Sequence, residues 1–173
     1  MQHLILGGVK SGKSQYAETL AAATGKPVTY IATATCGDAE MAARITQHQQ
    51  QRPAHWQLIE EPIELSRVLD TLKQHTECIL IDCLTLWITN LLIQEEPQLK
   101  QHVADLLSCL QQHPADIFFV SNETNMGITP MDSLSRRYCD EIGLLHQQLG
   151  AHCDAVSLMV AGIATPIKGP RHD

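Results

Sequence analysis

Residues 7–14 have the composition and order of a loop that binds the phosphates of a nucleoside triphosphate. They read Gly-Gly-Val-Lys-Ser-Gly-Lys-Ser and fill every fixed position of the pattern G-x-x-x-x-G-K-[ST]. The glycines let backbone N–H groups surround phosphate oxygens, the lysine reaches the β- and γ-phosphates, and the last hydroxyl ligates Mg²⁺. We therefore expect nucleotide contacts from Gly7, Gly8, Val9, Lys10, Ser11, Gly12, Lys13 and Ser14, with Lys13 also catalytic.

A second element supports this loop. Ile79-Leu80-Ile81-Asp82 is an apolar run that ends in a carboxylate. On its own such a run is often only the end of a strand. Together with the loop it predicts a Mg²⁺ site, in which Asp82 holds the ion through water beside Ser14. The two elements predict triphosphate binding, but they do not distinguish a kinase from an ATPase, a GTPase or a motor.

Arg44, His48 and Arg52 recur at intervals of four residues in a segment predicted to be helical over 38–52. Because a helix advances 100° per residue, four residues drift by only about 40°, and the three side chains form one cationic stripe. The stripe is either a solvated helix face or a polyphosphate clamp. In the second interpretation the guanidiniums disfavour protonation of His48. A neutral imidazole is a nucleophile that can attack the α-phosphorus of a bound nucleotide and expel pyrophosphate.

Strand-like and helix-like segments alternate along the chain. Apolar runs typical of strands covered on both faces lie at 4–6, 28–32, 78–81, 117–120 and 156–161, with an edge strand at 163–167. Helix-length segments lie at 13–24, 38–52, 62–74, 84–93, 97–112 and 131–149. This alternation predicts an α/β fold, with a doubly wound, mostly parallel sheet and an edge strand near the C-terminus. No linker or repeat divides the chain, so residues 1–173 are expected to form a single domain.

Composition restricts the classes of protein that remain. The chain has 173 residues, of which 44% are hydrophobic and 18% charged, and a net charge of −7. These values exclude a disordered tail, and the acidic balance argues against binding to nucleic acid. No apolar run reaches the ~18 residues of a membrane span, and no secretory signal is recognisable. The six cysteines lack C-x₂-C spacing and are expected to be reduced thiols, so the prediction is a cytoplasmic protein without membrane insertion.

Longer stretches of the sequence match the motifs of a known protein family more specifically than the phosphate loop does. They are Gly7-Gly8-x-x-Ser11-Gly12-Lys13-Ser14, Tyr30-Ile31-Ala32-Thr33, Glu40-Met41-x-x-Arg44-Ile45-x-x-His48-x-x-x-Arg52-Pro53, Asp82-Cys83-Leu84-Thr85-Leu86-Trp87-x-x-Asn90 and Ser121-Asn122-Glu123. With these stretches the chain resembles the bifunctional adenosylcobinamide kinase / adenosylcobinamide-phosphate guanylyltransferase family of cobalamin synthesis. The likeness covers nearly the whole chain.

The resemblance implies a substrate and two reactions. Members of the family phosphorylate the primary hydroxyl on the aminopropanol arm of adenosylcobinamide, and then transfer GMP from GTP to the new phosphate through a guanylylated histidine. That histidine falls on His48. The likeness also implies Mg²⁺, ATP or GTP as phosphoryl donor, a RecA-like P-loop fold and a homotrimer. The nucleotide contacts it implies outside the phosphate loop are Thr33, Ala34, Thr35, Arg44, Gln49, Gln50, Gln51, Arg52, Glu60 and Asp82.

Several other residues have more than one interpretation. Glu123, after the run at 117–120, is either the base that accepts the proton of the substrate hydroxyl or a strand-end carboxylate in an ion pair. Thr85, Trp87 and Asn90 are interpreted as a patch that reaches the surface, although Trp87 is better explained as a core residue than as a contact for a planar corrin. Positions at which the chain departs from the family are Lys10 and Cys139, each for Arg, Asn125 for Gly and His146 for Asn.

Two other functions remain compatible with the residues alone. One is a small-molecule kinase with the same phosphate loop and no covalent step. The other is a non-enzymatic module whose partner surface responds to nucleotide binding, an interpretation that gives the stripe of Arg44, His48 and Arg52 no purpose.

Overall fold

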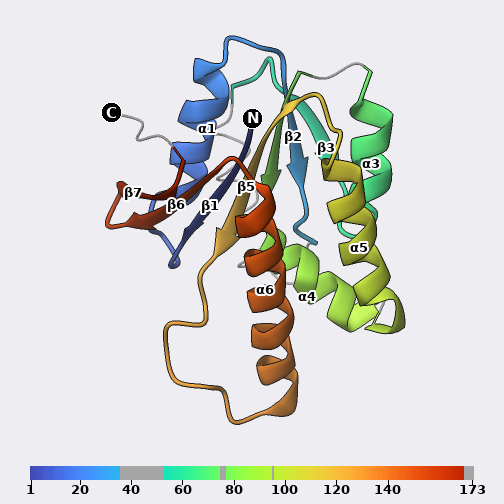
Figure 1. The fold of residues 1–173 in the computed structure, drawn as a ribbon, viewed down its shortest axis with the longest axis vertical. Helices are drawn as coiled ribbons and strands as arrows, with labels where there is room; N and C mark the ends of the chain where they lie inside the picture. Colours follow the sequence, from blue (N-terminus) through green and yellow to red (C-terminus); the bar gives the residue numbers. More distant parts are fainter. Residues whose placement is uncertain (36–52, 75–76, 95, 170–173) are drawn as a thin grey trace.

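The computed structural model describes residues 1–35, 53–74, 77–94 and 96–169. Within these ranges the chain forms one seven-stranded sheet with helices on both faces (Figure 1). The helix predicted at 38–52 lies outside the described residues.

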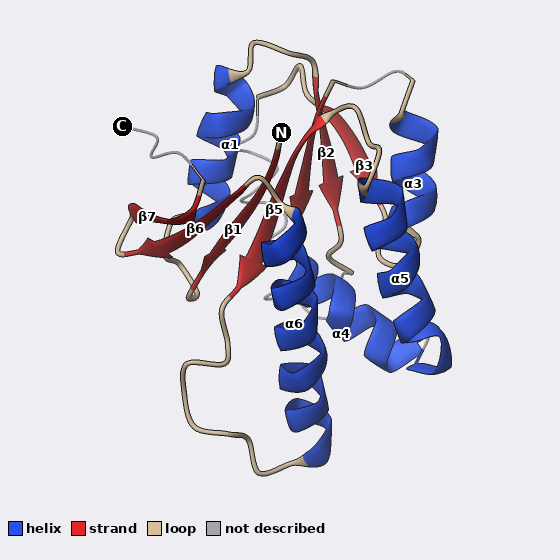
Figure 2. Ribbon diagram, viewed as in Figure 1, coloured by secondary structure: helices blue, strands red, loops and turns tan. Residues whose placement is uncertain are grey.

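The sheet is parallel except at its C-terminal edge (Figure 2). Its strands are β1 (Gln2–Gly7), β2 (Val28–Ala32), β3 (Gln57–Glu60), β4 (Cys78–Asp82), β5 (Asp116–Asn122), β6 (Ala155–Val160) and β7 (Ile163–Lys168). They are ordered β3-β2-β4-β5-β1-β6-β7, and only the pair β6 and β7 is antiparallel. The carboxyl ends of β1, β2, β3, β4 and β5 therefore meet at one edge of the sheet. This arrangement confirms the predicted doubly wound, mostly parallel α/β fold.

The helices divide between the two faces of the sheet. They are α1 (Lys13–Ala23), α3 (Leu65–Leu72), α4 (Leu84–Gln94), α5 (Leu99–Leu110) and α6 (Ser133–His152), with a short 3₁₀ turn at Glu96–Gln98. Helix α1 packs against β1, β4 and β5 on one face, whereas α3, α5 and α6 cover the other face (Figure 1). Helix α4 packs against β5, α5 and α6.

The central strands are apolar on both faces because both faces are covered. On β4, Leu80 lies in the hydrophobic cluster that contains Ala17 and Ala21 of α1. Its neighbours Ile79 and Ile81 point the other way, into the cluster formed with α3, α4, α5 and α6. All three strand residues are fully buried, which explains why the strand has no alternation of polar and apolar residues.

One strand was not predicted, and two predicted boundaries were wrong. Strand β3 lacks an apolar run because it lies at the edge of the described sheet, paired there with β2, and its side chains are mostly exposed. The helix predicted from residue 62 begins only at Leu65, because the Glu61 carboxylate accepts the N–H groups of Ile63 and Glu64 in a preceding turn. The strand predicted at 156–161 ends at Val160, where Ala161 and a glycine turn the chain with φ of 52° and 81°.

The proposed surface patch on α4 is a buried cluster. The exposed fractions of Thr85, Trp87 and Asn90 are 4%, 0% and 5%, so the interpretation of Thr85 and Asn90 as surface residues was wrong. The core interpretation of Trp87 is confirmed. Its indole N–H donates to the carbonyl of Ile63 at 2.8 Å, which fastens the segment before α3 to α4.

We predict that Trp87→Phe lowers the free energy of unfolding by about 2 to 4 kcal/mol. The substitution leaves a cavity in a fully buried site and removes the donor to the Ile63 carbonyl. Urea denaturation followed by circular dichroism measures the change. Ile93→Ala, on the same helix but 71% exposed, is the matched control and is expected to change the value by less than about 0.5 kcal/mol. Equal effects of the two substitutions would contradict the anchoring role of Trp87.

Candidate functional site

The phosphate loop joins β1 to α1 in the conformation that its glycines permit. Gly12, immediately before α1, has a φ of 94°, which few side chains tolerate. A Cβ atom at Gly12 would lie 3.3 Å from the Cα of Gly162, and the N–H of Gly162 donates to the carbonyl of Ser11 at 3.0 Å. The loop is therefore supported from behind by the turn between β6 and β7.

Two groups inside the loop are suited to bind phosphate. The Lys13 ammonium is buried and donates to the carbonyl of Gly8 at 2.6 Å, so it curls back over the loop. Burial lowers the pKa of Lys13, and the negative charge of Asp82 partly offsets that effect. The Ser11 hydroxyl is also buried, and it has no hydrogen-bond partner among the described residues. A phosphate oxygen would give the hydroxyl a partner and the ammonium a stronger acceptor than a carbonyl.

Asp82 is placed at the end of β4 as the sequence predicted. Its Oδ2 accepts the hydroxyl of Tyr30 at 3.0 Å, which restricts the orientation of the carboxylate. The described residues contain no group of three or more His, Cys, Asp or Glu side chains able to hold a metal ion. Mg²⁺ is commonly held by one or two protein oxygens together with phosphates and water. Ser14 and Asp82 supply oxygens of the type that this ion prefers.

A buried polar network holds the chain that follows β2. The Thr33 hydroxyl donates to the carbonyl of Cys83 at 2.7 Å and accepts its N–H at 2.9 Å. The Asn90 amide donates to the carbonyls of Thr33 at 2.8 Å and Pro62 at 3.2 Å, and accepts the hydroxyl of Thr35 at 3.3 Å. The Thr33 side chain is fully buried and already bonded to Cys83. Its predicted nucleotide contact is therefore better made by Ala34 or Thr35, which are partly or fully exposed.

Glu123 lies directly after β5 and beside the phosphate loop. Its N–H donates to the carbonyl of Gly7 at 2.9 Å, and its Oε1 accepts the N–H of Asn125 at 2.7 Å. Its Oε2 is 3.9 Å from Nδ1 of His146. Burial lowers the pKa of His146, although Glu123 opposes this effect, so the imidazole is neutral at neutral pH and the contact is not an ion pair there. Among the described residues, the predicted ion-pair alternative for Glu123 is thus weakened.

The structure brings most of the predicted site residues to one edge of the sheet. Glu60 ends β3 next to Ala32 of β2, and Asp82 ends β4 in the next position. Glu123 and the phosphate loop follow on β5 and β1. The predicted residues Arg44, His48, Gln49, Gln50, Gln51 and Arg52 lie outside the described part of the chain.

Three contributors to this edge were missed or misread in the sequence. Tyr30 orients Asp82, Asn90 joins the segments after β2 and β3, and His146 faces Glu123. Of these three residues only Asn90 gave a signal in the sequence, because it is a polar residue within the apolar helix at 84–94. A polar side chain buried in such a helix needs a hydrogen-bond partner. Nothing in the sequence alone pairs His146 with Glu123, because the residues are brought together by the packing of α6.

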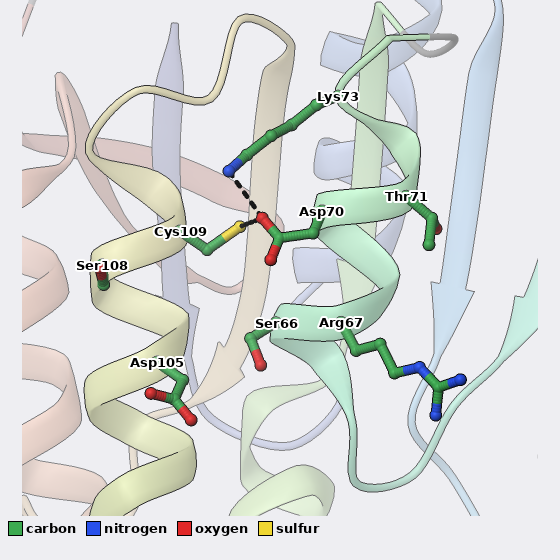
Figure 3. Close-up of a pocket in the computed structure, with 8 residues that line it drawn as sticks. All are labelled: Ser66, Arg67, Asp70, Thr71, Lys73, Asp105, Ser108 and Cys109. Atoms are coloured by element: carbon green, nitrogen blue, oxygen red, sulfur yellow. Dashed lines mark hydrogen bonds and ion pairs between the residues drawn. The ribbon is translucent and has the colours of Figure 1, made fainter.

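A groove of about 630 Å³ lies elsewhere, between α3 and α5 (Figure 3). The ammonium of Lys73 pairs with Oδ1 of Asp70 at 2.6 Å, and the thiol of Cys109 donates to the same oxygen at 3.2 Å. Burial raises the pKa of Cys109 to about 11, so this thiol is protonated and unreactive at neutral pH. None of the predicted site residues lines the groove, and we place the candidate site at the carboxyl edge of the sheet. The five described cysteines are all free thiols, as predicted, and Cys36 lies outside the described residues.

Comparison with known proteins gives a match to one family over almost the whole chain. The family described as cobinamide kinase / cobinamide phosphate guanyltransferase matches residues 3–167. The bifunctional adenosylcobalamin biosynthesis protein CobP of Pseudomonas aeruginosa is 51% identical, over 98% of this chain and 98% of that protein. The bifunctional adenosylcobalamin biosynthesis protein CobU of Escherichia coli is 36% identical, over 97% of this chain and all of that protein.

Solved structures share the fold at much lower identity. The RadB recombinase is 16% identical with a TM-score of 0.54, over 91% of this chain and 73% of that chain. The KaiC-like protein PH0186 of Pyrococcus horikoshii is 14% identical with a TM-score of 0.50, over 91% of this chain and 69% of that chain. These likenesses confirm the predicted P-loop, RecA-like fold.

We predict that Gly7→Ala lowers the free energy of unfolding by about 1 to 3 kcal/mol. A Cβ atom at Gly7 would lie 2.5 Å from the carbonyl oxygen of Met159 and 2.6 Å from Oγ of Ser11, so β6 or the loop must move. Gly8→Ala is the matched control, since a Cβ atom there meets nothing within 4 Å. Denaturant unfolding without nucleotide compares the two variants. A Gly8→Ala variant as unstable as Gly7→Ala would show that steric contact is not the cause.

Proposed function

This chain belongs to the cobinamide kinase / cobinamide phosphate guanyltransferase family of transferases, and on that premise we propose that it carries out both reactions on adenosylcobinamide. It first phosphorylates the aminopropanol hydroxyl, and then transfers GMP from GTP to the new phosphate to give adenosylcobinamide-GDP. The observation that carries the proposal is the family match over residues 3–167, because it includes both the phosphate loop and His48.

In the first reaction the substrate hydroxyl attacks the γ-phosphorus of ATP or GTP, the bond from this phosphorus to the bridging oxygen of the β-phosphate breaks, and ADP or GDP leaves. The loop amides, the Ser11 hydroxyl and the Lys13 ammonium surround the phosphates and stabilise the charge of the transferring group. Glu123 accepts the proton of the attacking hydroxyl, and its backbone bond to Gly7 keeps it beside the loop. Mg²⁺ bound by Ser14 and Asp82 would supply further charge neutralisation.

In the second reaction His48 is the nucleophile. Its neutral imidazole attacks the α-phosphorus of GTP, a P–N bond forms, and pyrophosphate leaves with the electrons of the broken P–O bond. A phosphate oxygen of adenosylcobinamide phosphate then attacks the same phosphorus and releases the histidine. Arg44 and Arg52 counter the charge that develops on the phosphoryl oxygens. Thr35, Glu60 and the segment 49–51 are proposed to contact the guanine nucleotide.

The proposed assembly is a cytoplasmic homotrimer. In the residues described, Met126, Ile128 and Met131 are 76%, 98% and 96% exposed on the loop between β5 and α6, and Leu134 follows on α6. Several exposed apolar side chains on one loop and the start of the next helix support an interface with another copy of the chain. No helix in the described part of the chain is long and apolar enough to cross a membrane.

We predict that the purified protein converts adenosylcobinamide to adenosylcobinamide phosphate with ATP or GTP and Mg²⁺, and to adenosylcobinamide-GDP with GTP. Liquid chromatography with mass spectrometry identifies both products. Phosphorylation without formation of the GDP product would leave an ordinary small-molecule kinase. Nucleotide binding without either product would instead support a non-enzymatic module.

We predict that His48→Asn abolishes guanylyl transfer and keeps the kinase rate within about threefold, because only the second reaction needs the imidazole as nucleophile. Mass spectrometry after incubation with GTP should show an acid-labile, base-stable guanylyl group in the wild type and none in the variant. His55→Asn, an exposed histidine near the same segment, is the matched control and should retain the label. Equal loss of both activities in His48→Asn would indicate damage to folding, and a retained label would exclude His48 as the nucleophile.

A further inference from the structure

A serine, a histidine and a carboxylate lie in a row beside the phosphate loop. Nε2 of His146 on α6 is 2.7 Å from Oγ of Ser121 on β5, and Nδ1 of the same ring is 3.9 Å from Oε2 of Glu123. The other carboxylate oxygen, Oε1, accepts the N–H of Asn125 at 2.7 Å. The two reactions proposed above assign a role to Glu123 but none to His146.

The row is not a nucleophilic triad, although its order resembles one. Ser121 is fully buried in a strand that is covered on both faces, so no substrate can reach its hydroxyl. The exposed end of the row is the carboxylate, since the side chain of Glu123 is 16% exposed and that of His146 is 9% exposed. Any chemical effect of the row is therefore exerted at Glu123.

Charge and burial determine which nitrogen of the ring carries the proton. Burial lowers the pKa of His146 more than the nearby Glu123 raises it, so the ring is neutral at neutral pH and has one N–H group. An ionised carboxylate accepts hydrogen bonds and cannot donate them. The N–H group therefore belongs on Nδ1, which faces Glu123, and Nε2 accepts the hydroxyl of Ser121.

We propose that His146 is a positioning residue, which directs its Nδ1–H at Oε2 of Glu123 and so holds that carboxylate in place for phosphoryl transfer. The inference rests on the proposed function, in which Glu123 accepts the proton of the substrate hydroxyl. The N–H of Asn125 donates to one carboxylate oxygen at 2.7 Å, and Ser121 fixes the ring that faces the other oxygen. At 3.9 Å the contact of Nδ1 with Oε2 is an attraction between the N–H dipole and the carboxylate charge, without a hydrogen bond, and it favours one orientation of the carboxylate.

Two amide substitutions separate positioning from packing. The side-chain nitrogen of asparagine takes the place of Nδ1, whereas that of glutamine takes the place of Nε2. His146→Asn thus keeps a donor toward Glu123, and His146→Gln keeps only the contact with Ser121. We expect His146→Gln to lower kcat of phosphoryl transfer about fivefold to tenfold with the nucleotide KM unchanged. We expect His146→Asn to restore kcat to within about twofold of the wild type.

Nitrogen-15 NMR of the histidine side chains provides a test that needs no activity. The expected result is a neutral His146 with its proton on Nδ1 at neutral pH, and a proton on Nε2 would overturn the proposal. In the kinetics, equal effects of the Asn and Gln variants, or a Gln variant with wild-type kcat, would likewise overturn it. If the Glu123→Gln variant phosphorylates the substrate at the wild-type rate, Glu123 is not the base, and the inference about His146 fails with it. If the wild-type protein shows no kinase turnover, the proposed function is contradicted instead. The NMR measurement of the His146 tautomer would still show whether its N–H faces Glu123.

Discussion

The position of β5 between β1 and β4 is the constraint on which the site depends. Residues Ile117 to Ser121 of this strand are buried, and the strand is paired in parallel on both sides. Strands in a sheet lie roughly 4.8 Å apart, so β5 keeps the phosphate loop and Asp82 about two strand spacings from one another. Because Glu123 follows β5 directly, the same strand brings a carboxylate between the two.

Buried polar side chains then fix the segments that follow the strands at this edge. Thr33, Asn90 and Ser121 are all nearly inaccessible, and each has a hydrogen-bond partner at the carboxyl edge of the sheet. A polar group buried without a partner is destabilising, so such a network permits few alternative arrangements. The segment after β2 and the start of α4 are therefore held in one relative position. Flexible loops at this edge would not give the ligand a defined geometry.

The sequence was sufficient for the parts of the structure that depend on local pattern. The phosphate loop, Asp82 and the apolar strands could be predicted because spacing and continuous hydrophobicity specify them. Strand β3 could not, since its residues are largely exposed and its pairing with β2 depends on a contact remote in sequence. The burial of Asn90 and the approach of His146 to Glu123 also depend on helix packing. Asn125 illustrates the same limit: it stands where the family has Gly without adopting a positive φ, and its amide donates to the carbonyl of Cys139 at 2.9 Å, a contact made by the packing of α6.

The contact between Gly162 and the phosphate loop extends the site to the far end of the chain. The hairpin of β6 and β7 carries no predicted ligand-binding residue, yet its turn supplies the N–H that the Ser11 carbonyl accepts and comes within van der Waals reach of Gly12. A chain truncated before this turn would lose a wall of the nucleotide site along with an edge strand. Selection on nucleotide affinity is therefore expected to act on the C-terminal hairpin, and substitutions at Gly12 and Gly162 should co-vary among relatives.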